Sequence, residues 1–75
     1  MEVKKAFGLV LKQARTEKTL SQEQLASLSN LDRTYISLME RGIRNPTLET
    51  IFAIAFALEL MPSELVTKTE KILNK

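Results

Sequence analysis

Two hydrogen-bonding side chains, Arg33 and Thr34, stand at the start of an expected helix and carry the clearest chemistry in this chain. Asp32 precedes them and can cap that helix, because its carboxylate can accept hydrogen bonds from free backbone amides. An arginine placed there can bond O6 and N7 of guanine, and a threonine can offer its methyl to thymine or its hydroxyl to other bases. One turn on, Ser37 can touch a base or a phosphate, and an outward Leu38 suits a thymine methyl. These types and spacings predict a surface that reads base edges, and the alternative for each residue is a solvated helix face.

Two further polar residues lie where a phosphate can be held. Gln22 stands in the first turn of the preceding expected helix, where free amides and the positive end of the helix dipole favour an anion. Its alternative role is in the cap of that helix. Tyr35 can bond a phosphate through its hydroxyl or pack against the preceding helix, and we favour the phosphate.

Apolar residues and local start signals predict four helices, at residues 3–18, 22–28, 33–41 and 48–58. Pro62 and Ser63 open a short fifth helix through about Val66. The positions expected to face the core are Phe7, Val10, Leu11, Ala14, Leu25, Ala26, Ile36, Met39, Leu48, Ile51, Ala55 and Leu58. Gly8 either lets another helix approach closely or is simply tolerated. The pattern leaves open whether the residues after Val66, up to Lys75, extend the last helix or fray.

Local signals define the two central helices. Ser21 and Gln24 form a Ser-x-x-Gln capping box, and Asn30 suits a turn that needs a left-handed backbone. Gly42 is expected to end the second helix as a left-handed C-cap. The outcome is two short helices joined by a sharp turn, a helix-turn-helix at about residues 21–41 whose second helix enters the major groove of DNA.

Composition limits the function classes. Seventy-five residues allow one domain with one core, and the formal net charge of +2 is a mild basic excess compatible with nucleic acid. The chain has no histidine and no cysteine, and no paired carboxylates, Gly-rich phosphate loop or nucleophile elbow nominates an active site. We therefore expect no enzyme, no catalytic residue, no metal, no cofactor and no small-molecule ligand. With no signal peptide and no apolar run long enough for a bilayer, we expect a cytoplasmic protein that does not bind membranes.

The order of the motif residues resembles the phage repressor/Cro type of helix-turn-helix regulators. The family pattern stands here as Ser21-Gln22, Leu25-Ala26, Ile36-Ser37, Glu40, Gly42, Pro46 and the apolar helix from Leu48. Within that family, residues 30–37 with Glu40-Arg41-Gly42 and Arg44-Asn45-Pro46 are similar to controller proteins of restriction-modification systems. Those proteins are small homodimers that bind operators ahead of their own gene and the endonuclease gene. Asn30 departs from the glycine usual in the wider family, which affects only the turn geometry.

The resemblance implies a fold and several roles. The fold would be all-α, a five-helix lambda-repressor-like DNA-binding domain over residues 1–75, with the helix-turn-helix at helices two and three. Arg44 and Asn45 would contact the DNA backbone, with a solvated turn as the alternative. Arg15 and Glu40 would form a structural ion pair between helices one and three, which orients the recognition helix without reading sequence.

Apolar side chains near the C-terminus exceed what a small core needs. The expected dimer interface comprises Phe52, Phe56, Leu60, Leu65 and Val66. Two-fold association through helix five and the end of helix four would bury this surplus, and one helix-turn-helix alone makes too few contacts for specific affinity. The hypothesis is therefore a homodimeric transcription regulator that binds double-stranded DNA at a pseudo-palindromic operator. RNA polymerase is a further candidate partner, although no residue stands out as its contact.

Three alternatives remain open. The chain can be a phage repressor fragment or an antitoxin, which neighbouring genes would distinguish from a controller protein. It can also be a helical module that binds another protein through its helix-five surface. Arg33 and Thr34 speak against the last alternative, because a pure protein binder does not need groove-reaching side chains there.

Overall fold

The structure, a computed structural model, describes residues 1–74, and five helices make up that part of the chain. They are α1 (Val3–Glu17), α2 (Gln22–Ser29), α3 (Arg33–Glu40), α4 (Leu48–Ala57) and α5 (Pro62–Leu73). The predicted all-α fold is confirmed, and each end of the first four helices lies within one residue of its expected place. The fifth helix continues well beyond residue 66, and Lys75 lies outside the described residues.

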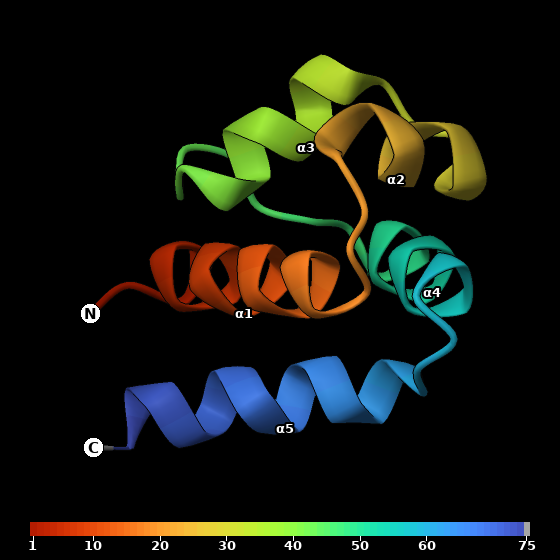
Figure 1. Cartoon of the computed structure of the whole chain (residues 1–75). Coiled ribbons are helices and arrows are strands. Elements are labelled where there is room, and N and C mark those ends of the chain that lie inside the picture. The colour runs from red at the N-terminus through yellow and green to blue at the C-terminus, as the bar shows by residue number, and fades with distance from the viewer. Residues whose placement is uncertain (75) are drawn as a thin grey trace.

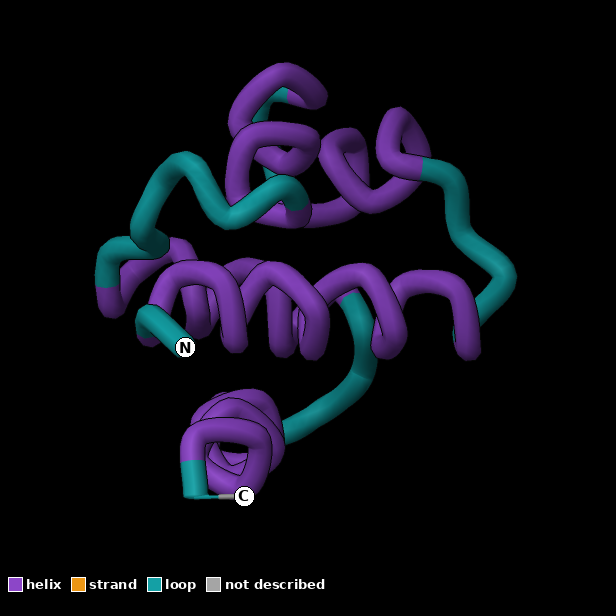
Figure 2. Tube along the Cα trace, turned by 90° about the vertical axis from the view of Figure 1, so that its left-hand side faces the viewer, coloured by secondary structure: helices purple, strands orange, loops and turns teal. Residues whose placement is uncertain are grey.

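The helices form layers around α1. In Figure 1, α1 lies between α3 above it and α5 below it, and α4 closes one side of the molecule. Figure 2 shows the same order after a quarter turn, with α5 seen end-on below the other helices. Helix α2 packs against both α3 and α4, so the two helices of the motif rest on the rest of the protein along one side only. Their opposite side is left free for a partner.

One apolar core holds these layers together. Its largest fully buried side chains come from every helix: Val10, Leu11, Leu25, Ile36, Met39, Ile54, Leu58 and Leu65. Ile36 and Met39 anchor α3, and both have no exposed surface. Because they lie on the inner stripe of α3, its outer stripe is turned to solvent.

The buried face of α4 differs from the predicted one. Leu48 was expected in the core, but it is 70% exposed. The most deeply buried residues of this segment are Ile54, Ala55 and Leu58, so the inner face is centred about a quarter turn from Leu48. Ile51, a second expected core residue, is only partly buried against the core.

Within residues 1–74, no single helix is long and apolar enough to cross a membrane. Helices α4 and α5 meet the length and hydropathy required only when they are taken together, and the pair is bent by 109°.

Gly8 is the point of closest contact between α1 and α3. A methyl group added there would clash with the Met39 carbonyl oxygen and lie 2.9 Å from that of Glu40. Of the two interpretations left open by the sequence, the close approach is therefore correct. The missing side chain lets the end of α3 pack directly on α1, which sets the distance between these two helices.

The turn between α2 and α3 and the turn that follows α3 adopt the expected left-handed backbone. Asn30 has φ 58° and ψ 38°, and its amide bonds the carbonyl of Ser27. Gly42 has φ +74° and directly follows Arg41, the C-cap of α3. Both predicted turn positions are confirmed, and between them they define where α3 begins and ends.

Candidate nucleic-acid interface

Helix α3 begins with a defined cap that leaves its first side chains free. The Asp32 carboxylate accepts a hydrogen bond from the Thr34 backbone amide at 3.1 Å. Arg33 and Thr34 follow the cap, and both are exposed. Among residues 1–74 the only salt bridge lies elsewhere, so the Arg33 guanidinium is not paired with a carboxylate. It is therefore available to an external acceptor.

Ser37 and Leu38 continue the outer side of α3 one turn further on. Both are partly buried, in contrast to Arg33 and Thr34. The Leu38 carbonyl accepts backbone hydrogen bonds from Ile43 at 2.9 Å and from the following residue at 3.3 Å. This ties the loop after α3 to the last turn of the helix, so loop and helix present one continuous surface.

A bidentate ion pair between α1 and α3 holds α3 against the rest of the protein. Arg15 Nε donates to Glu40 Oε2 at 2.6 Å, and Arg15 Nη2 donates to Glu40 Oε1 at 3.0 Å. The two side chains are 11% and 3% exposed, so the pair is almost removed from water. The Leu20 carbonyl, just before α2, accepts a third bond from Arg15 Nη1 at 2.7 Å. The ion pair that the resemblance implied is present, and it also fixes the segment leading into α2.

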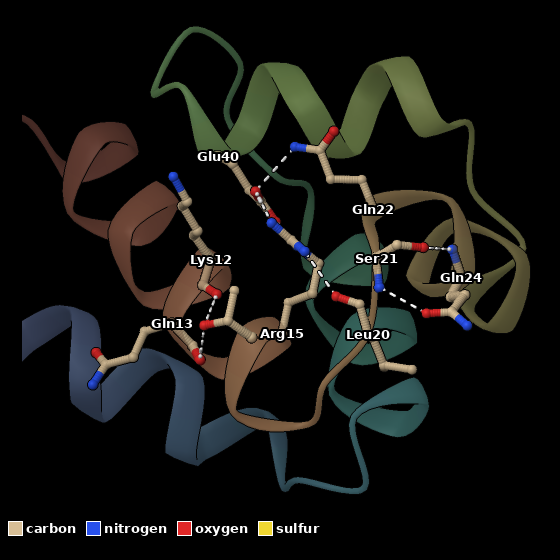
Figure 3. Close-up of polar contacts among 9 residues, drawn as sticks. Lys12, Gln13, Arg15, Leu20, Ser21, Gln22, Gln24 and Glu40 are labelled. Carbon is tan, nitrogen blue, oxygen red and sulfur yellow. Dashed lines mark hydrogen bonds and ion pairs between the residues drawn. The ribbon is translucent and has the colours of Figure 1, made fainter.

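Gln22 adds α2 to this network. Its Nε2 donates to Glu40 Oε1 at 3.0 Å, so the carboxylate receives bonds from both α1 and α2 (Figure 3). The capping box of α2 is formed by Ser21 and Gln24 instead, with bonds of 2.8 and 3.0 Å. Gln22 is thus not needed for the cap. Its place at the start of α2 agrees with a phosphate contact, which stays a prediction.

Hydrogen bonding to Glu40 raises the pKa of the Arg15 guanidinium above its already high ordinary value, although burial alone would lower it. A raised pKa means that the folded state favours the charged form. This contribution to stability is complete below the ordinary pKa and fades only as the pH rises through the raised value. Arg15 therefore stays charged at neutral pH, and its side of the ion pair is insensitive to pH there.

Tyr35 joins α3 to the following loop and to α4. Its hydroxyl donates to the Asn45 carbonyl at 3.2 Å and lies 3.4 Å from Thr50 Oγ1. The guanidinium carbon of Arg44 lies 5.7 Å from the centre of the Tyr35 ring, a cation–π arrangement. A phosphate contact through the hydroxyl would need its hydrogen to leave the Asn45 carbonyl. The observed role of Tyr35 is to position the loop, and its phosphate contact remains a prediction.

A shallow hollow of about 210 Å³ lies at this side of the motif. Its lining residues are Asp32, Thr34, Tyr35, Leu38 and Arg44. The structure therefore brings together the first turn of α3, predicted to read bases, and the loop predicted to hold phosphates. Arg44 and Asn45 are both exposed, as such contacts require.

The predicted dimer residues divide into two groups. Phe52, Phe56 and Val66 are 56%, 84% and 50% exposed, so they are accessible to a partner. Leu65 has no exposed surface, and its assignment to the interface was wrong. It lies on the side of α5 that packs against the core, and a second copy has no access to it. Leu60 is partly buried against the same core, so only part of it can face outward.

Two features of the site escaped the sequence analysis. The bonds from Gln22 to Glu40 and from Arg15 to the Leu20 carbonyl join residues whose spacing gives no helical signal. Thr50 is buried and bridges Tyr35 and Thr47, with 2.8 Å between the two threonine hydroxyl oxygens. The link from this pair to Tyr35 depends on how α3 and α4 pack, which local sequence does not show.

Comparison with known proteins places the chain among regulators of similar size. The helix-turn-helix family matches residues 11–65. Control protein C.MunI of Mycoplasma sp is 45% identical over 71 residues, covering 93% of this chain and 96% of that protein. Among solved structures, the restriction-modification controller protein C.AhdI from Aeromonas hydrophila is 50% identical, with a TM-score of 0.81 over 83% of this chain and 94% of that one. The controller protein C.Esp1396I, crystallised as a tetramer with its natural 35-base-pair operator, is 37% identical, with a TM-score of 0.88 over 100% and 99% of the two chains.

Proposed function

We propose that the protein is the controller protein of a restriction-modification system. The premise is that the chain belongs to the helix-turn-helix family of phage repressor/Cro-type DNA-binding regulators. It is not an enzyme, since the family acts by binding DNA. As a regulator of bacterial operators it would work in the cytoplasm. One observation carries the proposal: the capped first turn of α3 is exposed and unpaired while its opposite side is fixed in the core.

In the proposed complex α3 enters the major groove. Arg33 and Thr34 read base edges, and Ser37 and Leu38 make contacts one turn further along. Gln22, Tyr35, Arg44 and Asn45 set the register on the phosphates. The Arg15–Glu40 pair supports the helix from behind and carries no base preference of its own.

The proposed assembly is a homodimer formed through Phe52, Phe56, Leu60 and Val66 on α4 and α5. A two-fold axis would place two copies of α3 in successive major grooves, about 34 Å apart along the duplex. Such an arrangement predicts a pseudo-palindromic operator. Contact with RNA polymerase is a further part of the proposal that would determine whether binding activates or represses.

Selection from a random duplex library tests this function. At a stated salt concentration, the retained sequences should share two half-sites related by a two-fold axis and centred about one helical turn apart. Recovery of sequences with no shared element would overturn the proposal. Recovery of a single unrepeated half-site would leave DNA binding standing and overturn the dimer.

A further inference from the structure

Arg41 occupies a position on α3 that the roles above leave unexplained. It is the C-cap of the helix, and its φ of −82° and ψ of −2° continue the helical backbone by one residue. At 3.6 residues per turn, Arg33, Ser37 and Arg41 follow one another along the outer side of the helix. Thr34 and Leu38 lie on the same side, and Arg41 falls near the middle of the arc of about 140° that all five span.

The residues on either side of Arg41 in the chain pack closely against α1. The carbonyls of Met39 and Glu40 rest against Gly8 of α1, and Gly42 lies so close to Lys5 that an added methyl would be 2.8 Å from its side chain. Arg41 itself is exposed. Within residues 1–74 its guanidinium has no ion-pair partner, because the only salt bridge there joins two other residues.

We propose that Arg41 is a second base-reading arginine, which hydrogen-bonds the edge of a guanine at the far end of each half-site. This inference rests on the proposed function, because it assumes that α3 lies in the major groove. Helix α3 has eight residues and is therefore about 12 Å long, about the width of the groove. A residue at its far end still faces the bases, and the long planar guanidinium can reach O6 and N7 of guanine together.

A positive charge at the end of α3 has two simpler uses, which the test must separate from base reading. It can complement the negative end of the helix dipole, or it can attract a phosphate. Both uses need the charge alone, so lysine can replace arginine. Bidentate recognition of guanine also needs the planar fork, which lysine lacks.

The experiment repeats the duplex selection with the wild-type protein, Arg41→Ala and Arg41→Lys. The wild type is expected to prefer guanine at one position in each half-site that Arg41→Ala no longer specifies, while the positions read by Arg33 stay unchanged. At the lost position, discrimination should fall by about 5- to 150-fold per half-site. Arg41→Lys keeps the positive charge, so it should bind scrambled duplex as tightly as the wild type does. It should not show the full preference of the wild type for guanine.

Three outcomes would overturn the inference. Identical selected sequences for wild type and Arg41→Ala would show that Arg41 does not read a base. A uniform loss of affinity on all duplexes, fully restored by Arg41→Lys, would assign Arg41 to a phosphate. A loss of thermal stability with unchanged preference would assign it to the helix end. If the wild type itself selects no sequence, the proposed function fails first, so the two failures can be told apart.

Discussion

At the scale of single residues, α3 and its loop divide the work of DNA binding. Arg33 is exposed at the capped start of the helix, where base edges are in reach. Arg44 lies in the loop, with its guanidinium stacked over Tyr35. A side chain placed in this way can set a register without reading a base, because phosphates look alike at every step.

Replacing Arg44 with alanine should therefore weaken binding to operator and scrambled duplex by similar factors. The physical reason is the loss of one counterion-releasing contact, which should also flatten the dependence of log K on log salt by about 0.9 per contact. Titrations at several salt concentrations measure both quantities. A loss confined to the operator, with an unchanged salt slope, would show that Arg44 reads bases instead.

The left-handed residues give a prediction about stability. Thr19 has φ 57°, which strains a β-branched side chain. Thr19→Gly should raise the free energy of unfolding by up to about 1 kcal/mol, because glycine adopts this conformation without a clash. Thr16→Gly, an exposed change inside α1, should lower it by about as much. Urea unfolding of both variants checks the opposite signs, and a decrease for both would contradict the proposed strain.

At the scale of helices, sequence patterns predicted the elements better than the contacts between them. Ser21, Asp32 and Gly42 are local signals, and they placed the ends of α2 and α3 within one residue. The depth of Leu48 depends on how α4 turns toward the core, which apolar spacing alone does not determine when a helix is apolar on most sides. The depth of Leu65 depends on how α5 packs against α1 and α4. The extension of α5 could not be read from the sequence for a different reason, because residues 67–71 are all polar and give no apolar spacing.

The contact between α1 and α3 has a direct test at Gly8. Gly8→Ala should destabilise the fold by about 1–3 kcal/mol, since the added methyl meets backbone carbonyls that cannot move aside alone. It should also weaken operator binding, because α3 would be displaced from its support. Leu9→Ala, a change at the exposed neighbouring position, serves as the control and should have little effect on either. Wild-type stability in Gly8→Ala would mean that the helices are not in close contact.

The Arg15–Glu40 pair shows a second kind of information that the sequence lacked. The resemblance implied the pair, but the structure adds Gln22 and the Leu20 carbonyl to it. One nearly buried carboxylate thus joins three helices. The network therefore connects α1 and α2 to the Glu40 end of α3.

At the scale of the whole molecule, the exposed aromatic residues of α4 provide the test of assembly. Phe56 is 84% exposed, so replacing it should cost the monomer core little. Phe56→Ser should shift the protein toward monomer in sedimentation equilibrium, because burial of the ring contributes about 1.5–3 kcal/mol to a contact. Leu28→Ser, which removes an exposed leucine from α2, should leave the association constant unchanged. Equal association of wild type and Phe56→Ser would place the dimer surface elsewhere.

The central claim is that the first turn of α3 reads bases, and affinity measurements on Arg33→Ala test it most directly. Dissociation constants are measured for wild type and variant on the selected operator and on a scrambled duplex at the same salt concentration. The account predicts a loss of about 1–3 kcal/mol per half-site on the operator and a much smaller loss on the scrambled duplex. Equal losses on both duplexes would contradict it, because Arg33 would then be one more phosphate contact.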